Sequence, residues 1–134
     1  DKLAAHLPVL KGHSWTLRAA LPGGDFPING AANLATTLER DFRFLPPSLV
    51  HRWVRSYGTR TRTMLSNATL LSDLGTDFGH DLYAAEVDYL IDHEWAQSAD
   101  DILWRRSKLG LRFSIAATQK LEKYVKVRLQ RRHI

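Results

Sequence analysis

ADDILWRRSKLGL, residues 99–111, brings two acids, an apolar triplet and three basic side chains together in one short segment. Ser98 and Asp101 have the spacing of a capping box, which predicts that a helix begins here. Acids occupy the first turn and basic residues the last turns, as the helix dipole favours. Asp101 and Arg105 lie four residues apart, where an ion pair can form on a helix. Gly110 is expected to end the helix.

The apolar triplet 102–104 cannot point in one direction on an α-helix, because successive residues are about 100° apart. Ile102 and Leu103 align with Arg105 and Arg106, so the arginine stems are expected to lie along apolar surface. Such a helix is buried on more than one side, which favours a structural role over a catalytic one. Replacing Trp104 by Ala is then expected to cost about 3–5 kcal/mol if its side chain is buried.

Helical spacing of apolar residues and capping signals recur along the rest of the chain. Further helices are predicted over residues 32–42, 47–57, 59–65 and 82–96 (capped by Asp81), and a last helix is predicted to begin after its cap Ser114. No strand alternation follows residue 22, and residues 72–80 have the composition of a loop. The predicted fold is all-α, a compact bundle of about six helices with a short N-terminal stub from a preceding domain.

Apolar residues at helical spacing predict the buried faces. The predicted inward residues are Leu34, Leu38 and Phe42; Leu49, Val50, Trp53, Val54 and Tyr57; Leu82, Ala85, Tyr89 and either His93 or Leu90; and Ile115, Leu121, Tyr124, Val125 and Leu129. Residues 1–10 are typical of the last turns of an earlier helix, and residues 13–21 of a short extended piece. The turn-forming residues 22–25, PGGD, are the expected domain boundary.

The chain has 134 residues and no cysteine, which suits one domain and excludes disulfides and thiolate metal sites. This composition fits a reducing cytoplasm. No apolar run approaches the roughly 18 residues of a membrane span.

The net charge of +5 is unevenly distributed. Residues 73–101 hold nine acids and no Lys or Arg, whereas residues 105–134 hold ten Lys or Arg and one acid. Neighbouring segments of opposite charge are expected to neutralise each other. Two alternatives stay open. The last helix could lie on an anionic membrane surface. A basic group at Arg52, Arg55, Arg60 and Arg62 could bind DNA as part of a free-standing nucleic-acid-binding module.

His93-Glu94-Trp95-Ala96-Gln97 begins like the zinc-binding motif H-E-x-x-H, but Gln97 stands at the second ligand position. The two-histidine clamp therefore cannot form, and no metal site is expected. The sequence holds no glycine-rich phosphate cradle and no G-x-S-x-G elbow. A triad assembled from distant residues remains open at this level.

Residues 100–111, DDILWRRSKLGL, resemble the signature near the end of the FAD-dependent, respiratory glycerol-3-phosphate dehydrogenases, D-[IV]-L-W-R-R-[ST]-K-x-G. The signature positions are Asp101, Leu103, Trp104, Arg105, Arg106, Lys108 and Gly110. Other stretches resemble the family in the same order: LPGGD at 21–25, residues 46–60, DLYAAEVDYL at 81–90 and HEWA at 93–96. The similarity covers about residues 1–113.

The resemblance implies a domain division. Residues 1–22 would be the tail of the FAD/substrate domain plus a linker, and residues 23–134 the helical C-terminal domain. The parent enzyme would oxidise sn-glycerol 3-phosphate to dihydroxyacetone phosphate and pass electrons through FAD to quinone. It would be a bacterial enzyme, peripheral on the cytoplasmic face of the inner membrane.

The family's FAD-binding and catalytic part is absent from this sequence. No catalytic, cofactor-binding or metal residue is therefore carried over, and the fragment alone is expected to be inactive and without cofactor. The signature residues are expected to be structural. The implied partner is the N-terminal FAD/substrate domain of the same chain, and nucleic acid is not an expected partner.

Overall fold

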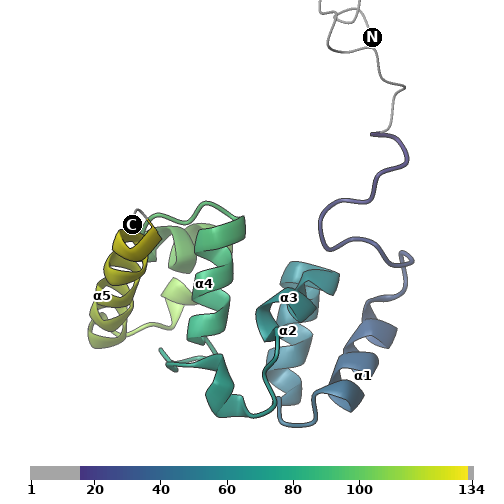
Figure 1. Cartoon of the computed structure of the whole chain (residues 1–134), viewed down its shortest axis with the longest axis horizontal. Coiled ribbons are helices and arrows are strands. Elements are labelled where there is room, and N and C mark those ends of the chain that lie inside the picture. Colours follow the sequence, from purple (N-terminus) through teal and green to yellow (C-terminus); the bar gives the residue numbers. More distant parts are fainter. Residues whose placement is uncertain (1–15, 133–134) are drawn as a thin grey trace, which may run out of the picture.

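A computed structural model describes residues 16–132, and these residues form a helical bundle without a named strand (Figure 1). The α-helices are α1 (Ala31–Asp41), α2 (Pro47–Tyr57), α3 (Thr61–Leu65), α4 (Ala84–His93) and α5 (Ile115–Arg132). Short 3-10 turns are η2 (Gly58–Arg60), η3 (Leu71–Leu74) and η5 (Leu109–Leu111), and η4 (Asp101–Arg106) is a π-helix. The predicted all-α class and the approximate number of helices are confirmed.

The bundle is built around α2. Pro47 stands in the first turn of α2, where its missing N–H is no loss, and Gly58 follows its last residue with φ of 54°. The predicted face of α2 is confirmed, because its five apolar residues are all buried and Trp53 is completely enclosed. Helix α1 packs along α2, and α4 contacts α3 and α5 (Figure 1).

Gly23 ties the segment before α1 to the end of α2. Its carbonyl accepts a hydrogen bond from the Thr59 N–H at 3.1 Å. A side chain on Gly58 would overlap this carbonyl, and a side chain on Gly23 would overlap the Tyr57 carbonyl. Both glycines have positive φ, so this close backbone contact requires glycine on both sides. The chain is thus anchored to the helical bundle from Gly23 onward.

The predicted helix over residues 82–96, capped by Asp81, is too long at both ends. At its start, the Phe78 N–H donates to the Leu82 carbonyl at 2.9 Å, and Asp81 adopts a φ of 62° in the resulting turn. Helix α4 therefore begins at Ala84, after an extended N-cap residue. At its end, Trp95 turns into the left-handed region with φ of 55° and stops the helix after His93. Residue type alone predicts the cap at Asp81. The two ends of α4 are set instead by the turn before Ala84 and by the chain reversal at Trp95.

Helix α5 begins as predicted, because the Ser114 hydroxyl accepts a hydrogen bond from the Ala117 N–H at 3.2 Å. Leu121 and Val125 are buried, but Ile115 is 79% exposed, so its predicted inward position is wrong. Ile115 precedes Leu121 by six residues, which places it about 240° away around the helix.

The prediction of a helix over residues 1–10 lies outside the described residues. Of the extended piece predicted at 13–21, residues 16–18 form a turn instead. In the described part of the chain, no helix has the length and apolar character needed to cross a membrane.

Two aspartates, Asp73 and Asp101, make the stability of the fold depend on pH. Backbone N–H groups of Thr69 and Gln97 hold the pKa of Asp73 and of Asp101, respectively, below the usual range. The unfolded chain therefore binds more protons than the folded chain in acid, so stability rises with pH there. We expect the urea midpoint to fall as the pH drops below about 4, the ordinary aspartate pKa.

The variant Asp101→Asn tests this assignment. It should lower the urea midpoint at pH 7 and shrink the difference between pH 7 and pH 3. The raised pKa of Asp88, caused by burial, acts in the opposite sense. Asp88→Asn should therefore not reduce the acid sensitivity, and an equal reduction in both variants would contradict the assignment.

Candidate functional site

The most completely buried charged residue is Glu86 on α4, which has no exposed surface. Its carboxylate accepts hydrogen bonds from both terminal nitrogens of Arg52, at 2.7 and 2.6 Å. It also accepts the Trp53 indole N–H at 2.8 Å and the Tyr57 hydroxyl at 2.7 Å. The three residues that donate these four hydrogen bonds all lie on α2, so this cluster joins α2 to α4 at the centre of the bundle.

The electrostatics of the cluster keep each group in its donating or accepting form. Burial, followed by the negative charge of Glu86, raises the pKa of Tyr57 far above its usual value, so its hydroxyl stays protonated. Burial alone would lower the pKa of Arg52, but its hydrogen bonds and charge attraction to Glu86 raise it. With four donors on it, the Glu86 carboxylate is occupied as a structural acceptor and does not face a substrate space.

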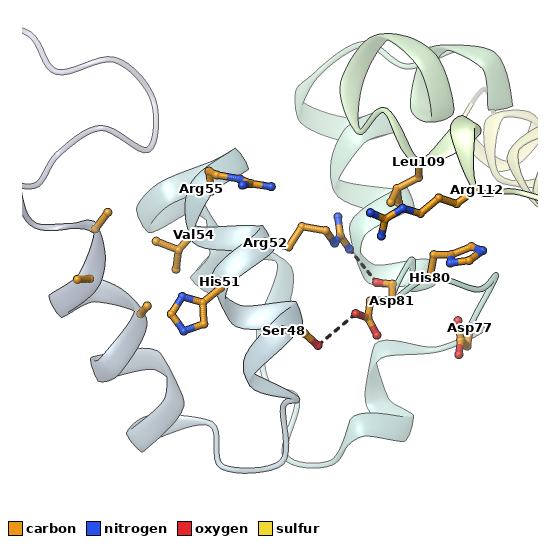
Figure 2. A pocket seen from close by; sticks show the side chains of 13 residues that line it. Ser48, His51, Arg52, Val54, Arg55, Asp77, His80, Asp81, Leu109 and Arg112 are labelled. Carbon is orange, nitrogen blue, oxygen red and sulfur yellow. Dashed lines mark hydrogen bonds between the residues drawn. The ribbon is translucent and has the colours of Figure 1, made fainter.

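An open cleft of about 820 Å³ lies between α2 and the turn that contains Leu109. Arg52, Arg55 and Arg112 point into this space from its two sides (Figure 2). Among the described residues, neither Arg55 nor Arg112 forms a side-chain hydrogen bond or ion pair. The cleft can therefore accept an anionic group at these two guanidinium ions.

Two carboxylates, those of Asp77 and Asp81, also line the cleft and reduce its positive charge. Asp81 accepts a hydrogen bond from the Ser48 hydroxyl at 3.3 Å (Figure 2), and Asp77 accepts one from the Gly79 N–H at 2.7 Å. On the lining of the cleft, His51 pairs with Glu39 at 3.1 Å and so is not a base for the Ser48 hydroxyl. The cleft thus carries mixed charge and no nucleophile with a base beside it.

The signature segment 98–111 starts with the predicted capping box. The Ser98 hydroxyl donates to Asp101 at 3.0 Å and accepts the Asp101 N–H at 3.1 Å, while the Gln97 N–H donates to the same carboxylate at 3.0 Å. The predicted ion pair between Asp101 and Arg105 is also present. These contacts confirm the predicted capping box and ion pair of Asp101.

The interior of this segment differs from the prediction. The Ser107 N–H donates to the Ile102 carbonyl at 2.9 Å, five residues back, so the segment is a π-helix rather than an α-helix. Ile102 and Leu103 are buried, but the next three residues, 104–106, are exposed. The expectation that the arginine stems lie on apolar surface is therefore wrong, because it assumed the α-helical period.

Trp104 is 46% exposed and lies over Gly110 instead of being enclosed in the core. A Cβ on Gly110 would lie 2.5 Å from the Trp104 indole, so the ring requires glycine at this position. The Lys108 ammonium donates to the Trp104 carbonyl at 2.5 Å, and Lys108 itself has a φ of 60°. The spacing of Trp104, Lys108 and Gly110 in the signature thus corresponds to a single turn, in which the chain folds back against the Trp104 indole.

We expect Gly110→Ala to destabilise the chain by about 1–3 kcal/mol, because the added methyl group overlaps the indole. The same substitution in a Trp104→Ala background should cost little, since the overlapping ring is gone. Urea denaturation of the four proteins in this double-mutant cycle measures the coupling. Equal costs in both backgrounds would show that Gly110 does not serve the indole.

Two of the four arginines in the basic group proposed for DNA binding form ion pairs within the fold. Arg52 is engaged with Glu86, and Arg62 pairs with Asp41 at 2.9 Å. Trp53, which was interleaved with these arginines in the sequence, is core. Two of the four arginines and the interleaved tryptophan are thus used inside the fold, which weakens the hypothesis of a nucleic-acid-binding module.

Acidic and basic segments neutralise each other between α4 and α5, as expected. Arg128 pairs with Asp88 at 3.0 Å and with Asp92 at 2.7 Å. The Tyr124 hydroxyl donates to Asp88 at 3.2 Å, and burial followed by the charge of Asp88 raises the pKa of Tyr124 to about 12. Helix α4 thus supplies the acidic partners of Arg128, whereas most of the other basic residues of α5 stay exposed.

At the zinc-like segment, the His93 ring packs against the Tyr89 ring with centroids 5.0 Å apart. Among the described residues, no group of three His, Asp or Glu side chains is arranged to hold a metal ion. The statement that this fragment contributes no catalytic, cofactor-binding or metal residue stays a prediction, as does the structural role assigned to the signature.

Sequence reasoning missed two residues. Glu86 lies four residues after Leu82 and four before Leu90, so it stands on the buried stripe of its helix. An acid in that register was the available signal for a buried charge. Trp95 is 78% exposed at the end of α4, and no local pattern distinguishes it from a core tryptophan.

Comparison with known proteins shows the family of this chain. A family model described as the C-terminal domain of alpha-glycerophosphate oxidase matches residues 14–131. The chain is 48% identical over 101 residues to aerobic glycerol-3-phosphate dehydrogenase of Escherichia coli (strain K12), covering 75% of this chain and 20% of that protein. It is 46% identical over 114 residues to glycerol-3-phosphate dehydrogenase of Pseudomonas aeruginosa, covering 85% and 22%.

The chain is also similar to a protein that is named for a different substrate. The chain is 42% identical over 103 residues to D-erythritol 1-phosphate dehydrogenase of Brucella abortus (strain 2308), covering 77% of this chain and 20% of that protein. The chain therefore spans about a fifth of the length of the curated relatives that it matches.

Proposed function

Because this chain belongs to the family of C-terminal domains of alpha-glycerophosphate oxidase, we propose that it is the helical accessory domain of an FAD-dependent sn-glycerol-3-phosphate dehydrogenase. The parent enzyme oxidises sn-glycerol 3-phosphate to dihydroxyacetone phosphate. The observation that carries this proposal is the family match over residues 14–131, joined by 48% identity to the Escherichia coli enzyme.

The catalytic part is assigned to the polypeptide preceding this domain. In this proposal residues 1–22 are the tail of the FAD/substrate domain plus a linker, and residues 23–134 are the helical domain. The hydrogen bond between Gly23 and Thr59 supports a boundary at this point. The described residues include no glycine-rich turn between a strand and a helix, the usual cradle for a dinucleotide, and the proposal assigns FAD to the preceding polypeptide.

Within the parent enzyme, FAD takes up the electrons of the substrate and passes them to quinone. The partners of the helical domain are then the N-terminal FAD/substrate domain and, through the parent, the cytoplasmic face of a bacterial inner membrane. The exposed basic residues on the outer side of α5 are compatible with an anionic surface nearby.

The test compares the full polypeptide with the 134-residue chain. The full polypeptide should carry flavin absorbance and reduce an artificial electron acceptor when sn-glycerol 3-phosphate is added. The chain alone should show neither. Flavin bound by the chain alone would overturn the domain division, and a full polypeptide that binds flavin but oxidises no polyol phosphate would overturn the function.

D-Erythritol 1-phosphate is a second candidate substrate, since a relative named for it is 42% identical to this chain. The two substrates share a phosphate ester and a neighbouring secondary alcohol and differ in chain length. Measuring kcat/KM for both with the same full polypeptide decides between them.

A further inference from the structure

Trp95 adopts a conformation that a tryptophan rarely takes. Its φ of 55° lies in the left-handed region, which is disfavoured for residues with a bulky side chain. Its side chain is 78% exposed, so the strain is not compensated by burial of the indole. Backbone outliers that the surrounding fold enforces are concentrated at functional sites.

The end of α4 explains why a left-handed residue is needed, but not why it is tryptophan. The Ala96 N–H donates to the Leu90 carbonyl at 3.0 Å, and Ala96 is completely buried, so the chain must reverse at position 95. Glycine normally supplies this conformation at a helix end because it has no Cβ. A tryptophan here is unfavourable for the isolated domain, which points to a role outside its own folding.

The indole stands at the edge of an aromatic groove of about 340 Å³. Tyr57 and Tyr89 form its wall, with ring centroids 5.5 Å apart, and Arg60 and Arg106 also line it. Among the described residues, the side chains of these two arginines form no ion pair. Tryptophan, tyrosine and arginine are the residues that dominate binding energy at protein interfaces.

The position of the linker identifies what covers this groove. Pro22, immediately before the anchored Gly23, is itself part of the groove lining. The segment that joins the helical domain to the preceding polypeptide therefore enters beside Trp95. The matched relatives are about five times as long as the region they share with this chain. In the proposed function, the N-terminal part is joined to the helical domain at this point.

We propose that the groove bounded by Tyr57, Tyr89, Trp95 and Arg106 is the surface on which the N-terminal FAD/substrate domain of the same polypeptide docks. This inference rests on the proposed function, which supplies that domain. Trp95 is the anchor that enters a pocket on the catalytic part, and Arg106 of the signature segment flanks it. The left-handed backbone holds the indole outward in the orientation that docking uses.

The variant Trp95→Gly separates docking from folding. In the 134-residue chain it should leave the thermal midpoint unchanged or raise it by about 3–6 °C, since glycine accepts the left-handed conformation. In the full polypeptide it should accelerate proteolytic cleavage within residues 16–22 about 30-fold, because the docked arrangement opens more often. Ile115→Ala, at an equally exposed position outside the groove, should change neither measurement.

A photo-reactive benzoylphenylalanine at position 95 of the full polypeptide tests the occupant directly. Mass spectrometry should find intramolecular cross-links from position 95 to the N-terminal domain and none from position 115. A lower thermal midpoint of Trp95→Gly in the chain alone would overturn the inference by showing a folding role. Cross-links from position 95 to a second copy or to lipid, or none, would overturn it as well.

Flavin content and polyol phosphate oxidation are measured on the same full polypeptide. If these are present while cross-links from position 95 are absent, the docking inference fails and the proposed function stands. If cross-links to the N-terminal domain form without flavin or oxidation, the proposed function fails and the docking surface stands.

Discussion

Glu86→Ala is expected to lower the free energy of unfolding by about 3–5 kcal/mol, the usual result of removing one partner from a buried ion pair. Glu86 is fully buried, and its loss leaves the Arg52 guanidinium, the Trp53 indole N–H and the Tyr57 hydroxyl without their acceptor. Domains of this size have about 5–15 kcal/mol of stability, so this loss removes a large share of the total. Urea denaturation followed by circular dichroism measures the loss.

The exposed pair of Asp101 and Arg105 provides the control. The Arg105 side chain is 77% exposed, so Arg105→Ala should cost no more than about 1 kcal/mol. Replacing both buried partners, as Arg52→Met with Glu86→Leu, should recover part of the loss because no uncompensated charge remains. A cost below 1 kcal/mol for Glu86→Ala would mean that water replaces the carboxylate and that the cluster does not stabilise the bundle.

Trp53→Ala is expected to cost about 3–5 kcal/mol, the range for removing a large aromatic side chain from a core. Trp53 has no exposed surface, and its loss opens a cavity between α2 and α4 and removes one donor from Glu86. Trp104→Ala should cost roughly 1–2 kcal/mol, because Trp104 is 46% exposed and buries correspondingly less area. The two tryptophans are distinguished by their urea midpoints under identical conditions.

Because Trp104 is half exposed, the expected cost of Trp104→Ala is smaller than the ~3–5 kcal/mol that the sequence predicts for a buried tryptophan. If Trp104→Ala destabilises the chain as much as Trp53→Ala does, the indole must be enclosed more fully in solution than in the structure. Trp53→Phe offers a matched variant, since it keeps most of the volume but cannot donate to Glu86. Its cost should be smaller than that of Trp53→Ala and should report the lost hydrogen bond.

Local patterns predicted a large part of this fold. The five-residue face of α2 was predicted from periodicity alone, and the capping box at Ser98 and Asp101 from a three-residue spacing. Such features involve residues within one or two turns of each other, so their geometry follows from the helix itself. The errors occurred at Asp81, Trp95 and Ile115, where the end of an element or a long register decides exposure.

Of the candidate sites, sequence reasoning located the signature segment and its first turn but not the buried cluster or the aromatic groove. Arg52 was assigned to a basic surface because its neighbours in sequence are basic. Its actual partner, Glu86, is 34 residues away on another helix. Trp95 gave no signal, because an exposed and a buried tryptophan look alike in a short apolar segment.

The amino-acid sequence by itself determined the helical class, most helix positions and the family, because helical period, caps and motif spacing are encoded over a few neighbouring residues. The tertiary structure alone decided which charges are buried, which tryptophan is exposed and where the chain enters the groove beside Trp95. The buried charge cluster depends on contacts between residues 29 or more positions apart, such as Tyr57 with Glu86, whose geometry no local pattern carries. For the π-helix at 101–106, the sequence is enough to identify the family, but only the structure shows which of its residues face outward.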